Sequence, residues 1–271
     1  MTRPTVIIVP ARYPSVRFPG KPLAVLTGAT GIARSLIHRS WAAACRVRGV
    51  DAVYVATDDD RIADAARGFG AEVLMTSTEC RNGTERCAEA LKLLPSEPGI
   101  VVNVQGDAPL TPPDYVEALI GGIAGMDAPD GVAVATPVLE TSGAHLARLR
   151  ADRAQGRVGG TTAVRAADGN ALYFSKEVIP FTGRDHAPDE ITPVLHHVGV
   201  YAYTPAALAR YAALPVGTLE ALEGLEQLRF LEAGIPVRCV EVAPKGRAFW
   251  ELNNPGDIPI IEEIMRREGI E

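Results

Sequence analysis

Residues 9–23 read VPARYPSVRFPGKPL, a strand end followed by a cationic loop rich in proline. It begins at the last residue of the apolar run Val6–Val9, which is typical of a buried strand. The loop that follows carries three cations, Arg12 and Lys21 among them, and no acidic residue. Its prolines limit backbone freedom, and Gly20 allows close approach of a ligand. The pattern indicates an anion site, although a solvated basic loop would have the same composition.

Apolar runs alternate with amphipathic stretches through the first half of the chain. The expected strands are Val6–Val9, Ala52–Ala56, Glu72–Met75 and Ile100–Val104, and the expected helices are Ile32–Arg46, Asp60–Phe69 and Thr84–Leu93. This alternation predicts an α/β fold with a mostly parallel sheet flanked by helices. Ligands of such sheets bind at the C-terminal ends of the strands, where the cationic loop is expected to lie.

From about residue 132 the pattern changes to strands separated by turns, which predicts a smaller antiparallel lobe. The expected strands are Val132–Leu139, Thr161–Arg165, Ala171–Phe174, Val198–Tyr203 and Val237–Val242, and the expected helices are Pro205–Leu214, Leu219–Ala233 and Pro255–Arg267.

The composition restricts the class of partner. The 271 residues carry a formal net charge of −6, which argues against nucleic acid and anionic membrane as partners and favours small molecules. Neither a membrane span nor a secretion signal is visible, so we expect a cytoplasmic protein. The four cysteines show no CxxC pairing and no histidines at metal spacing, so we expect reduced thiols rather than a zinc site.

Two known phosphate-binding patterns do not match the opening loop. The P-loop pattern fails because Ser15 stands five positions before Gly20 and Pro22 follows Lys21. The dinucleotide-binding fingerprint fails as well. Arg12 and Lys21 are nevertheless spaced to hold phosphates from two sides.

A second candidate site is VVNVQGDAPL, residues 101–110. Its apolar run leads into Gly106 and Asp107, where a carboxylate at the end of a strand could hold a divalent cation. The other interpretation is an aspartate in a type I turn before Pro109. A cationic phosphate loop nearby favours the metal, because a magnesium–nucleotide complex needs both cations and a carboxylate.

Seven stretches together resemble the CMP-Kdo synthetase (3-deoxy-manno-octulosonate cytidylyltransferase) family. They occur in this order over nearly the whole chain: IIVPARYPSVRFPGKPL, VYVATDDDRIADAA, GTERCAEA, VNVQGDAPL, ALYFSKEVIPF, HHVGVYAY and LEALEGLEQLRFLEAG. The resemblance implies a nucleotide-diphospho-sugar-transferase-like fold and a homodimer. It also implies an enzyme that uses CTP and Mg²⁺ to place CMP on a 2-keto-3-deoxy sugar acid, such as Kdo, with release of pyrophosphate.

The same resemblance implies roles for residues of the first half of the chain. Arg12 and Lys21 would contact the β and γ phosphates, and Asp107 would hold Mg²⁺; these three are the expected catalytic residues. The expected CTP-binding set is Pro10, Ala11, Arg12, Ser15, Lys21, Arg86 and Gly106. A surface ion pair in the first turn of a helix is the other interpretation of Arg86.

The acceptor site implied by the resemblance comprises Gln105, His197, Tyr201, Glu226 and Gln227. His197 could instead be a core histidine with its hydrogen bonds satisfied. Glu226 and Gln227 could form an exposed helix face, since neighbouring leucines already supply the buried side.

The chain departs from the family pattern at charged positions. Asn253 stands where the family has the first aspartate of Val-Asp-Thr-Pro-Glu-Asp, so the expected metal ligands are Asp107 and an amide. Asp257 is interpreted only as an acid of the first helical turn. Thr162 replaces a lysine, His196 an arginine, and Ala108 the glutamate of QGDEP.

Three functions stay open at this point. The first is a cytidylyltransferase for Kdo or a related sugar acid, and the second is the same chemistry on a small phosphonate such as phosphonoformate. The third is a catalytically silent nucleotide-binding protein. The expected organisation is one domain over residues 1–271, with a CTP-binding portion at 1–130, an acceptor and dimerisation lobe at 131–215, and a return to the main sheet at 216–271.

Overall fold

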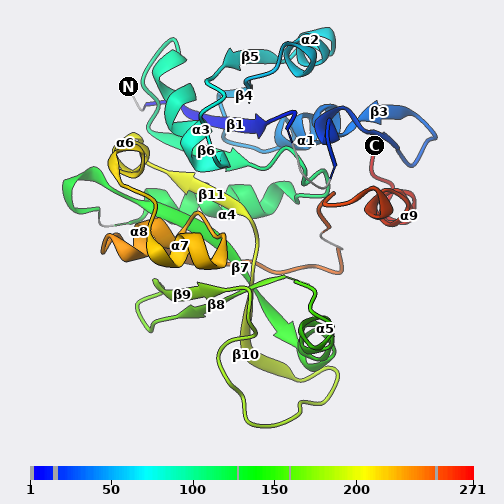
Figure 1. Ribbon diagram of the computed structural model, residues 1–271, viewed down its shortest axis with the longest axis vertical. Helices are drawn as coiled ribbons and strands as arrows, with labels where there is room; N and C mark the ends of the chain where they lie inside the picture. Colours follow the sequence, from blue (N-terminus) through cyan, green and yellow to red (C-terminus); the bar gives the residue numbers. More distant parts are fainter. Residues whose placement is uncertain (1–2, 15–17, 127, 159, 248–249) are drawn as a thin grey trace. The chain divides into compact units, whose positions relative to one another are not determined.

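The computed structural model describes residues 3–14, 18–126, 128–158, 160–247 and 250–271. The chain forms two compact units (Figure 1). The first unit comprises residues 1–120 and 245–271, and the second comprises residues 121–244. The segment predicted to return at 216–271 is thus divided after residue 244.

The first unit is built on a parallel sheet. Its strands are β1 (Thr5–Ala11), β4 (Ala52–Thr57), β5 (Glu72–Met75) and β6 (Ile100–Val104), in the order β5-β4-β1-β6. Six of the seven β1 residues are buried, as expected for a central strand covered on both faces. The connecting helices are α1 (Leu36–Ala44), α2 (Asp60–Gly68) and α3 (Gly83–Ala90). The predicted parallel α/β arrangement is confirmed.

Two predicted helices of this unit are too long. The helix expected at Ile32–Arg46 begins only at Leu36, because residues 33–35 form β3 (Ala33–Ser35), which pairs with β2 (Val25–Thr27). The helix expected at Thr84–Leu93 ends at Ala90 and continues as the short 3-10 helix η2 (Leu91–Leu93).

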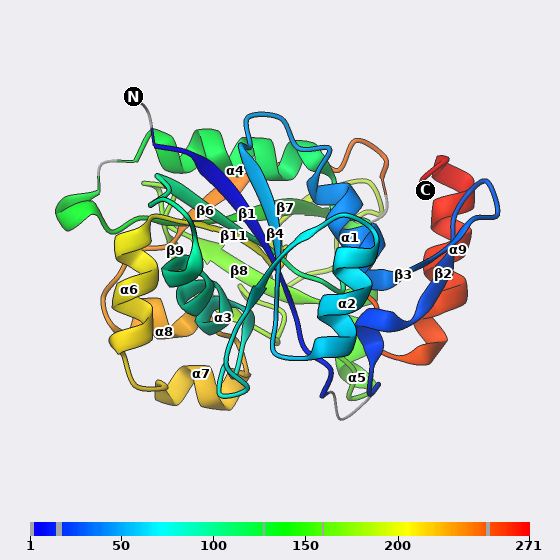
Figure 2. The same ribbon diagram turned by 90° about the horizontal axis from the view of Figure 1, so that it is seen from above.

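The C-terminal segment packs on the same unit. A 3-10 turn, η4 (Pro255–Asp257), precedes α9 (Ile258–Glu268), which lies beside β2 and β3 (Figure 2). Their shared core is formed by Leu26, Leu36, Leu110, Leu252, Ile261, Ile264 and Met265. The remaining elements of the first half are η1 (Lys21–Leu23) and α4 (Pro113–Ala124).

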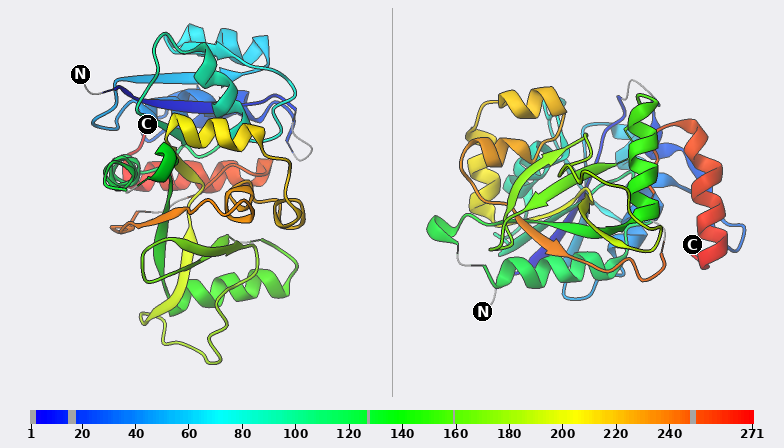
Figure 3. Two further views of the ribbon diagram at one scale, coloured as in Figure 1. Left: turned by 90° about the vertical axis from the view of Figure 1, so that its left-hand side faces the viewer. Right: turned by 90° about the horizontal axis from the view of Figure 1, so that it is seen from below.

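The second unit is mainly antiparallel. Strand β7 (Val134–Ser142) pairs with β10 (Ile191–His197) and β11 (Val200–Tyr203) in antiparallel fashion and with β12 (Arg238–Glu241) in parallel. Strands β8 (Thr161–Arg165) and β9 (Ala171–Ser175) extend the sheet beyond β10. The other elements are η3 (Pro129–Gly131), α5 (Gly143–Ala154), α6 (Pro205–Ala213), α7 (Thr218–Glu223) and α8 (Leu228–Glu232). Helix α5, green in Figure 3, lies along β7 and β10.

The helix predicted at Leu219–Ala233 is wrong as a single element. It is divided into α7 and α8, because Gly224 adopts a left-handed conformation with φ of 60° that ends α7. The strand predicted from Val198 begins at Val200, and β10 and α5 were not predicted. Within the described residues, no helix is long and apolar enough to cross a membrane.

Candidate active site

The opening loop returns on itself directly after β1. The Gly20 amide donates to the Tyr13 carbonyl at 3.0 Å, and Gly20 has a φ of +70° that other residues rarely adopt. The guanidinium of Arg61 lies 3.3 Å from the centre of the Tyr13 ring and holds the tyrosine in place. Lys21 then begins η1. Ser15, a predicted CTP ligand, lies outside the described residues.

The ends of β1 and β6 approach each other closely at Gly106. A Cβ atom on Gly106 would lie 2.6 Å from the Pro10 carbonyl oxygen, so no side chain is accommodated there. The Ser40 hydroxyl donates to the Gly106 carbonyl at 2.9 Å. The turn is therefore fixed against the last residues of β1, Pro10 and the buried Ala11.

This approach brings Lys21 to Asp107. Lys21 Nζ lies 2.5 Å from Asp107 Oδ2, and the two side chains are only 16% and 28% exposed. The Ala108 amide donates to the Gln105 carbonyl at 3.1 Å, so Asp107 does sit in a turn, as the alternative interpretation required. That turn directs its carboxylate toward the cationic loop. The structure thus joins the two candidate sites read from the sequence.

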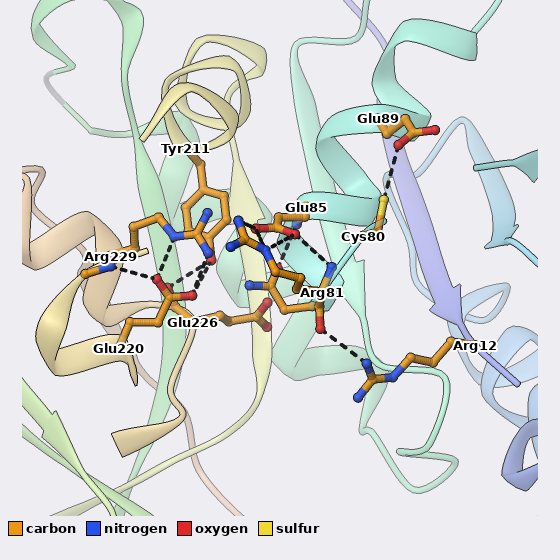
Figure 4. Close-up of polar contacts among 11 residues, drawn as sticks. Arg12, Cys80, Arg81, Glu85, Glu89, Tyr211, Glu220, Glu226 and Arg229 are labelled. Atoms are coloured by element: carbon orange, nitrogen blue, oxygen red, sulfur yellow. Dashed lines mark hydrogen bonds and ion pairs between the residues drawn. The ribbon is translucent and has the colours of Figure 1, made fainter. Parts of the chain in front are cut away.

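Arg12 is exposed and only lightly held. Its Nη1 donates to the Arg81 carbonyl at 3.3 Å, and Arg81 forms a bidentate ion pair with Glu85 in the first turn of α3 (Figure 4). An exposed guanidinium whose hydrogen bond to the described residues is this long can be redirected to a phosphate at little cost.

Arg86 is buried, unlike the surface residue of the alternative interpretation. Its Nη1 donates to Thr76 Oγ1 at 2.5 Å and its Nη2 to Asp58 Oδ2 at 3.1 Å, with 3% of its side chain exposed. Asp58 and Thr76 directly follow β4 and β5. Arg86 therefore braces the C-terminal edge of the sheet, and its contact with CTP stays a prediction.

Gln105 follows β6 and lies against the start of α3. A Cβ atom on Gly83 would lie 3.0 Å from both Asn103 Nδ2 and Gln105 Nε2. Asn103 is fully buried, and neither atom of its amide has a hydrogen-bond partner within the described part of the chain. The sequence analysis assigned no role to Asn103, because an isolated polar residue in an apolar strand has no motif.

The segment that carries Asn253 lies beside the Asp107 turn. The Leu252 amide donates to the Asp107 carbonyl at 2.9 Å, which fixes residues 251–253 next to the turn. Burial and the charge of Asp107 raise the pKa of Glu251 to about 7, opposed by Lys21 and by a hydrogen bond from Asn253. A carboxylate and an amide oxygen, as Asp107 and Asn253 offer, are ligand types that Mg²⁺ accepts. Glu251 belongs to no motif of the sequence and was not predicted near this turn.

Asp257 has a structural role. Its Oδ2 accepts from the amides of Asn253 and Asn254 at 2.9 and 2.7 Å, so it orders the backbone of the segment that carries Asn253. The predicted first-turn acid thus acts as a cap for the turn that leads into α9.

The predicted acceptor residues other than Gln105 lie in the second unit. His197 is 6% exposed, its Nε2 lies 2.9 Å from Thr136 Oγ1, and its ring packs against Phe174. Burial, with a smaller effect of His196, lowers the pKa of His197 to about 3, so its ring is neutral. These contacts are those of a core histidine with a hydrogen-bond partner, the alternative interpretation given above, and the predicted contact of His197 with the acceptor stays a prediction.

Tyr201 and Gln227 form a buried pair. The Tyr201 hydroxyl donates to Gln227 Oε1 at 2.9 Å, and both residues are at most 3% exposed. Gln227 Nε2 is buried without a hydrogen-bond partner among the residues that the structure describes. An amide with an unused donor can bind an oxygen of a ligand.

A buried ion pair holds the turn that carries Glu226 and Gln227. Arg229 donates to both carboxylate oxygens of Glu220 at 2.6 Å, and its guanidinium lies 4.0 Å from the centre of the Tyr211 ring (Figure 4). The Tyr211 hydroxyl donates to the Glu226 carbonyl at 3.3 Å. Glu226 and Gln227 thus lie between two short helices rather than on one exposed helix face.

The two uncharged replacements in this unit have structural partners. The Thr162 hydroxyl donates to the Glu177 carbonyl at 2.6 Å and accepts from the Ile179 amide at 3.2 Å. His196 packs edge-on against His145, with ring centres 5.0 Å apart, and burial lowers its pKa to about 4. Neither side chain supplies the positive charge of the residue it replaces.

Comparisons with known proteins identify the family of the chain. The chain is 46% identical to the 3-deoxy-manno-octulosonate cytidylyltransferase of Maricaulis maris over 97% of both chains. It is 39% identical to the 8-amino-3,8-dideoxy-manno-octulosonate cytidylyltransferase of Shewanella sediminis, covering 96% of this chain and 97% of that one. A solved structure of CMP:2-keto-3-deoxy-manno-octonic acid synthetase complexed with CTP matches 98% of the chain with a TM-score of 0.81 and 34% identity. The family model for cytidylyltransferases matches residues 6–239, and the chain therefore belongs to the cytidylyltransferase family of nucleotidyltransferases.

Proposed function

We propose that this enzyme transfers CMP from CTP to the anomeric hydroxyl of Kdo or a related 2-keto-3-deoxy sugar acid, with release of pyrophosphate. The observation that carries the proposal is the ion pair between Lys21 and Asp107 at the C-terminal edge of the parallel sheet. It combines a phosphate-binding cation with a metal-binding carboxylate, as a magnesium–nucleotide complex requires. Relatives named for Kdo and for its 8-amino analogue support a sugar acid as the acceptor.

Lys21 and Arg12 hold the β and γ phosphates, where negative charge accumulates as pyrophosphate leaves. The turn at Gly106 holds Asp107 beside Lys21. The backbones at Gly106 and Pro10 lie too close together for a nucleotide to bind between them. Asp107 and Asn253 would hold Mg²⁺, which would supply positive charge to neutralise the phosphates and to make the α-phosphorus a better electrophile. Pro10, Ala11, Ser15, Arg86 and Gly106 complete the predicted CTP-binding set.

The predicted acceptor ligands are Gln105 in the first unit and His197, Tyr201, Glu226 and Gln227 in the second. Gln227 offers a buried amide donor that has no partner in the described chain. Tyr201 fixes the orientation of this amide by donating to its oxygen. An amide donor and a phenol of this kind are suited to the hydroxyl groups of a sugar.

A homodimer is the proposed assembly, formed through the lobe at 131–215. The observation in its favour is the exposure of large apolar side chains on this lobe: Phe181 is 93%, Leu172 63% and Ile191 57% exposed. Exposed apolar groups of this size mark interaction surfaces when they lie together. Light scattering tests the assembly: a dimer is expected for the wild type and a shift toward monomer for Phe181→Asp. A cytoplasmic location stays a prediction.

Pyrophosphate release tests the proposed acceptor. CTP, Mg²⁺ and enzyme are incubated with Kdo, the 8-amino analogue, other sugar acids and phosphonoformate. We expect release with Kdo or its 8-amino analogue and little without an acceptor. Release with phosphonoformate alone would replace the sugar acid by the phosphonate, and binding of CTP without release for any acceptor would favour the silent protein.

A further inference from the structure

The place of Lys21 depends on the turn that precedes it. The Gly20 amide donates to the Tyr13 carbonyl at 3.0 Å, and Gly20 directly precedes η1, which begins at Lys21. The Leu23 amide donates to the Gly20 carbonyl at 2.9 Å and ties η1 to the same residue. A movement of Gly20 would therefore carry Lys21 away from the carboxylate of Asp107.

The Tyr13 ring supports this turn from the side. A Cβ atom on Gly20 would lie 3.1 Å from both Cζ and Oη of the tyrosine, so the ring packs directly on the glycine backbone. Tyr13 thus contacts Gly20 twice, through its carbonyl oxygen and through its ring. The position of the ring consequently sets the position of the turn.

The Tyr13 ring is in turn held by α2. The guanidinium of Arg61 lies 3.3 Å from the ring centre, which is a close cation–π contact. Asp59 fixes that guanidinium by accepting from its Nε at 3.0 Å and from its Nη2 at 2.7 Å, and it also caps α2 by accepting from the Arg61 amide. Helix α2 packs on β4, β5 and η1, so Arg61 is carried by an element that is fixed to the sheet.

We propose that Arg61 is a positioning residue for CTP. Its stack on Tyr13 holds the Gly20 turn in the conformation that presents Lys21 to the β and γ phosphates, a role that rests on the proposed function. Arg61 acts through the tyrosine ring and not by contact with the nucleotide. Both of its interactions use what distinguishes arginine from lysine, a planar group that pairs with a carboxylate through two hydrogen bonds and stacks on an aromatic face.

Binding of CTP and of CMP, measured by isothermal titration calorimetry with Mg²⁺ and no acceptor, tests this role. CMP lacks the β and γ phosphates, so its affinity does not depend on Lys21. Arg61→Gln is therefore expected to weaken CTP binding ~2–5-fold, the range that an exposed cation–π contact provides, and to leave CMP binding unchanged. A variant that merely destabilised the fold would weaken the binding of both nucleotides alike, or of neither.

Two variants of Tyr13 show whether the ring is the link. Tyr13→Phe keeps the ring and is expected to bind CTP as the wild type does, whereas Tyr13→Leu is expected to reproduce the loss of Arg61→Gln. The matched control is Arg67→Gln, which removes an arginine of the same helix from an exposed pair with Asp64 and should leave both affinities unchanged.

A double variant separates positioning from direct binding. Adding Arg61→Gln to Tyr13→Leu is expected to cause no further loss of CTP affinity, because the arginine acts through the ring. Losses that multiply would show that Arg61 contacts the triphosphate itself and would overturn the positioning role, and so would equal weakening of CTP and CMP binding.

The same measurements distinguish this inference from the proposed function. If Lys21→Ala weakens CTP binding while Arg61→Gln does not, the proposed function stands and this inference fails. If Arg61→Gln lowers the preference for CTP over CMP but no acceptor receives CMP from the wild type, the inference stands and the proposed function fails.

Discussion

Lys21 Nζ lies 2.5 Å from Asp107 Oδ2, and this ion pair joins two segments that are 86 residues apart. Each group neutralises the other while no substrate is present. Binding of a triphosphate to Lys21 and of a metal to Asp107 replaces this pair with two new ones. CTP and the metal are therefore expected to bind cooperatively, since each releases the partner of the other.

Removal of the phosphate-binding cations should slow catalysis and leave folding almost unchanged. Lys21→Ala and Arg12→Ala are each expected to reduce CMP transfer ~100-fold or more, because each removes a charge that stabilises the leaving group. The matched control is Lys92→Ala, an exposed lysine after α3. Steady-state rates and thermal unfolding are compared. A variant that melts at much lower temperature but keeps its rate when folded would assign the loop a structural role only.

Gly106→Ala tests the close approach of β1 and β6. The new Cβ would lie 2.6 Å from the Pro10 carbonyl oxygen, and backbone cannot move as a flexible side chain does. We expect a loss of ~1–3 kcal/mol in stability from overpacking, together with weaker CTP binding. Gly121→Ala in α4 is the control, since its Cβ meets open space and alanine favours helix by ~1 kcal/mol. Equal stability of the Gly106 variant and the wild type would contradict the packing described here.

Arg86→Ala should be strongly destabilising. Removal of one partner of a buried ion pair costs roughly 3–5 kcal/mol, because the carboxylate of Asp58 is left without compensation. Arg67→Ala, which breaks an exposed pair with Asp64, should cost at most ~1 kcal/mol. Urea unfolding measures both. Combining Arg86→Met with Asp58→Asn should recover stability, and if CTP affinity stays low in that variant, the predicted nucleotide contact of Arg86 gains support.

Acid should weaken the protein partly through His197. Its pKa is about 3 in the folded chain and near 6.5 when unfolded, so the unfolded chain binds more protons between these values. Stability therefore falls as the pH drops below 6.5, by up to ~1.4 kcal/mol per pH unit for this group. His197→Gln should reduce the slope of unfolding free energy against pH by about one proton between pH 4 and 6. An unchanged slope would show that His197 titrates normally in the folded protein.

The parallel half of the fold follows from local sequence. Its strands are continuous apolar runs, and a buried parallel strand needs no more than that to be recognised. The predicted boundaries of helices are wrong where tertiary contacts override the local sequence pattern. Residues 33–35 read as the first turn of α1, but they pair with β2, and a pairing between segments is not encoded in either one alone. Gly224 is apparent in the sequence, but its left-handed conformation depends on how α7 and α8 pack.

The parts of the candidate site that belong to sequence motifs could be predicted. The cationic loop and the Asp107 turn were found separately, and the structure supplied the ion pair that joins them. The burial of Arg86 could not be predicted, because its partners, Asp58 and Thr76, are distant in sequence.

Transfer of a label from the α-phosphate of CTP tests the central claim most directly. CTP radiolabelled at that phosphate is incubated with enzyme, Mg²⁺ and Kdo, and the products are separated by charge. The account predicts that the label appears in a CMP–sugar acid product in step with pyrophosphate, that ATP replaces CTP poorly, and that Lys21→Ala lowers the rate ~100-fold. Label that stays in CTP with every sugar acid, or equal transfer from ATP, would contradict it.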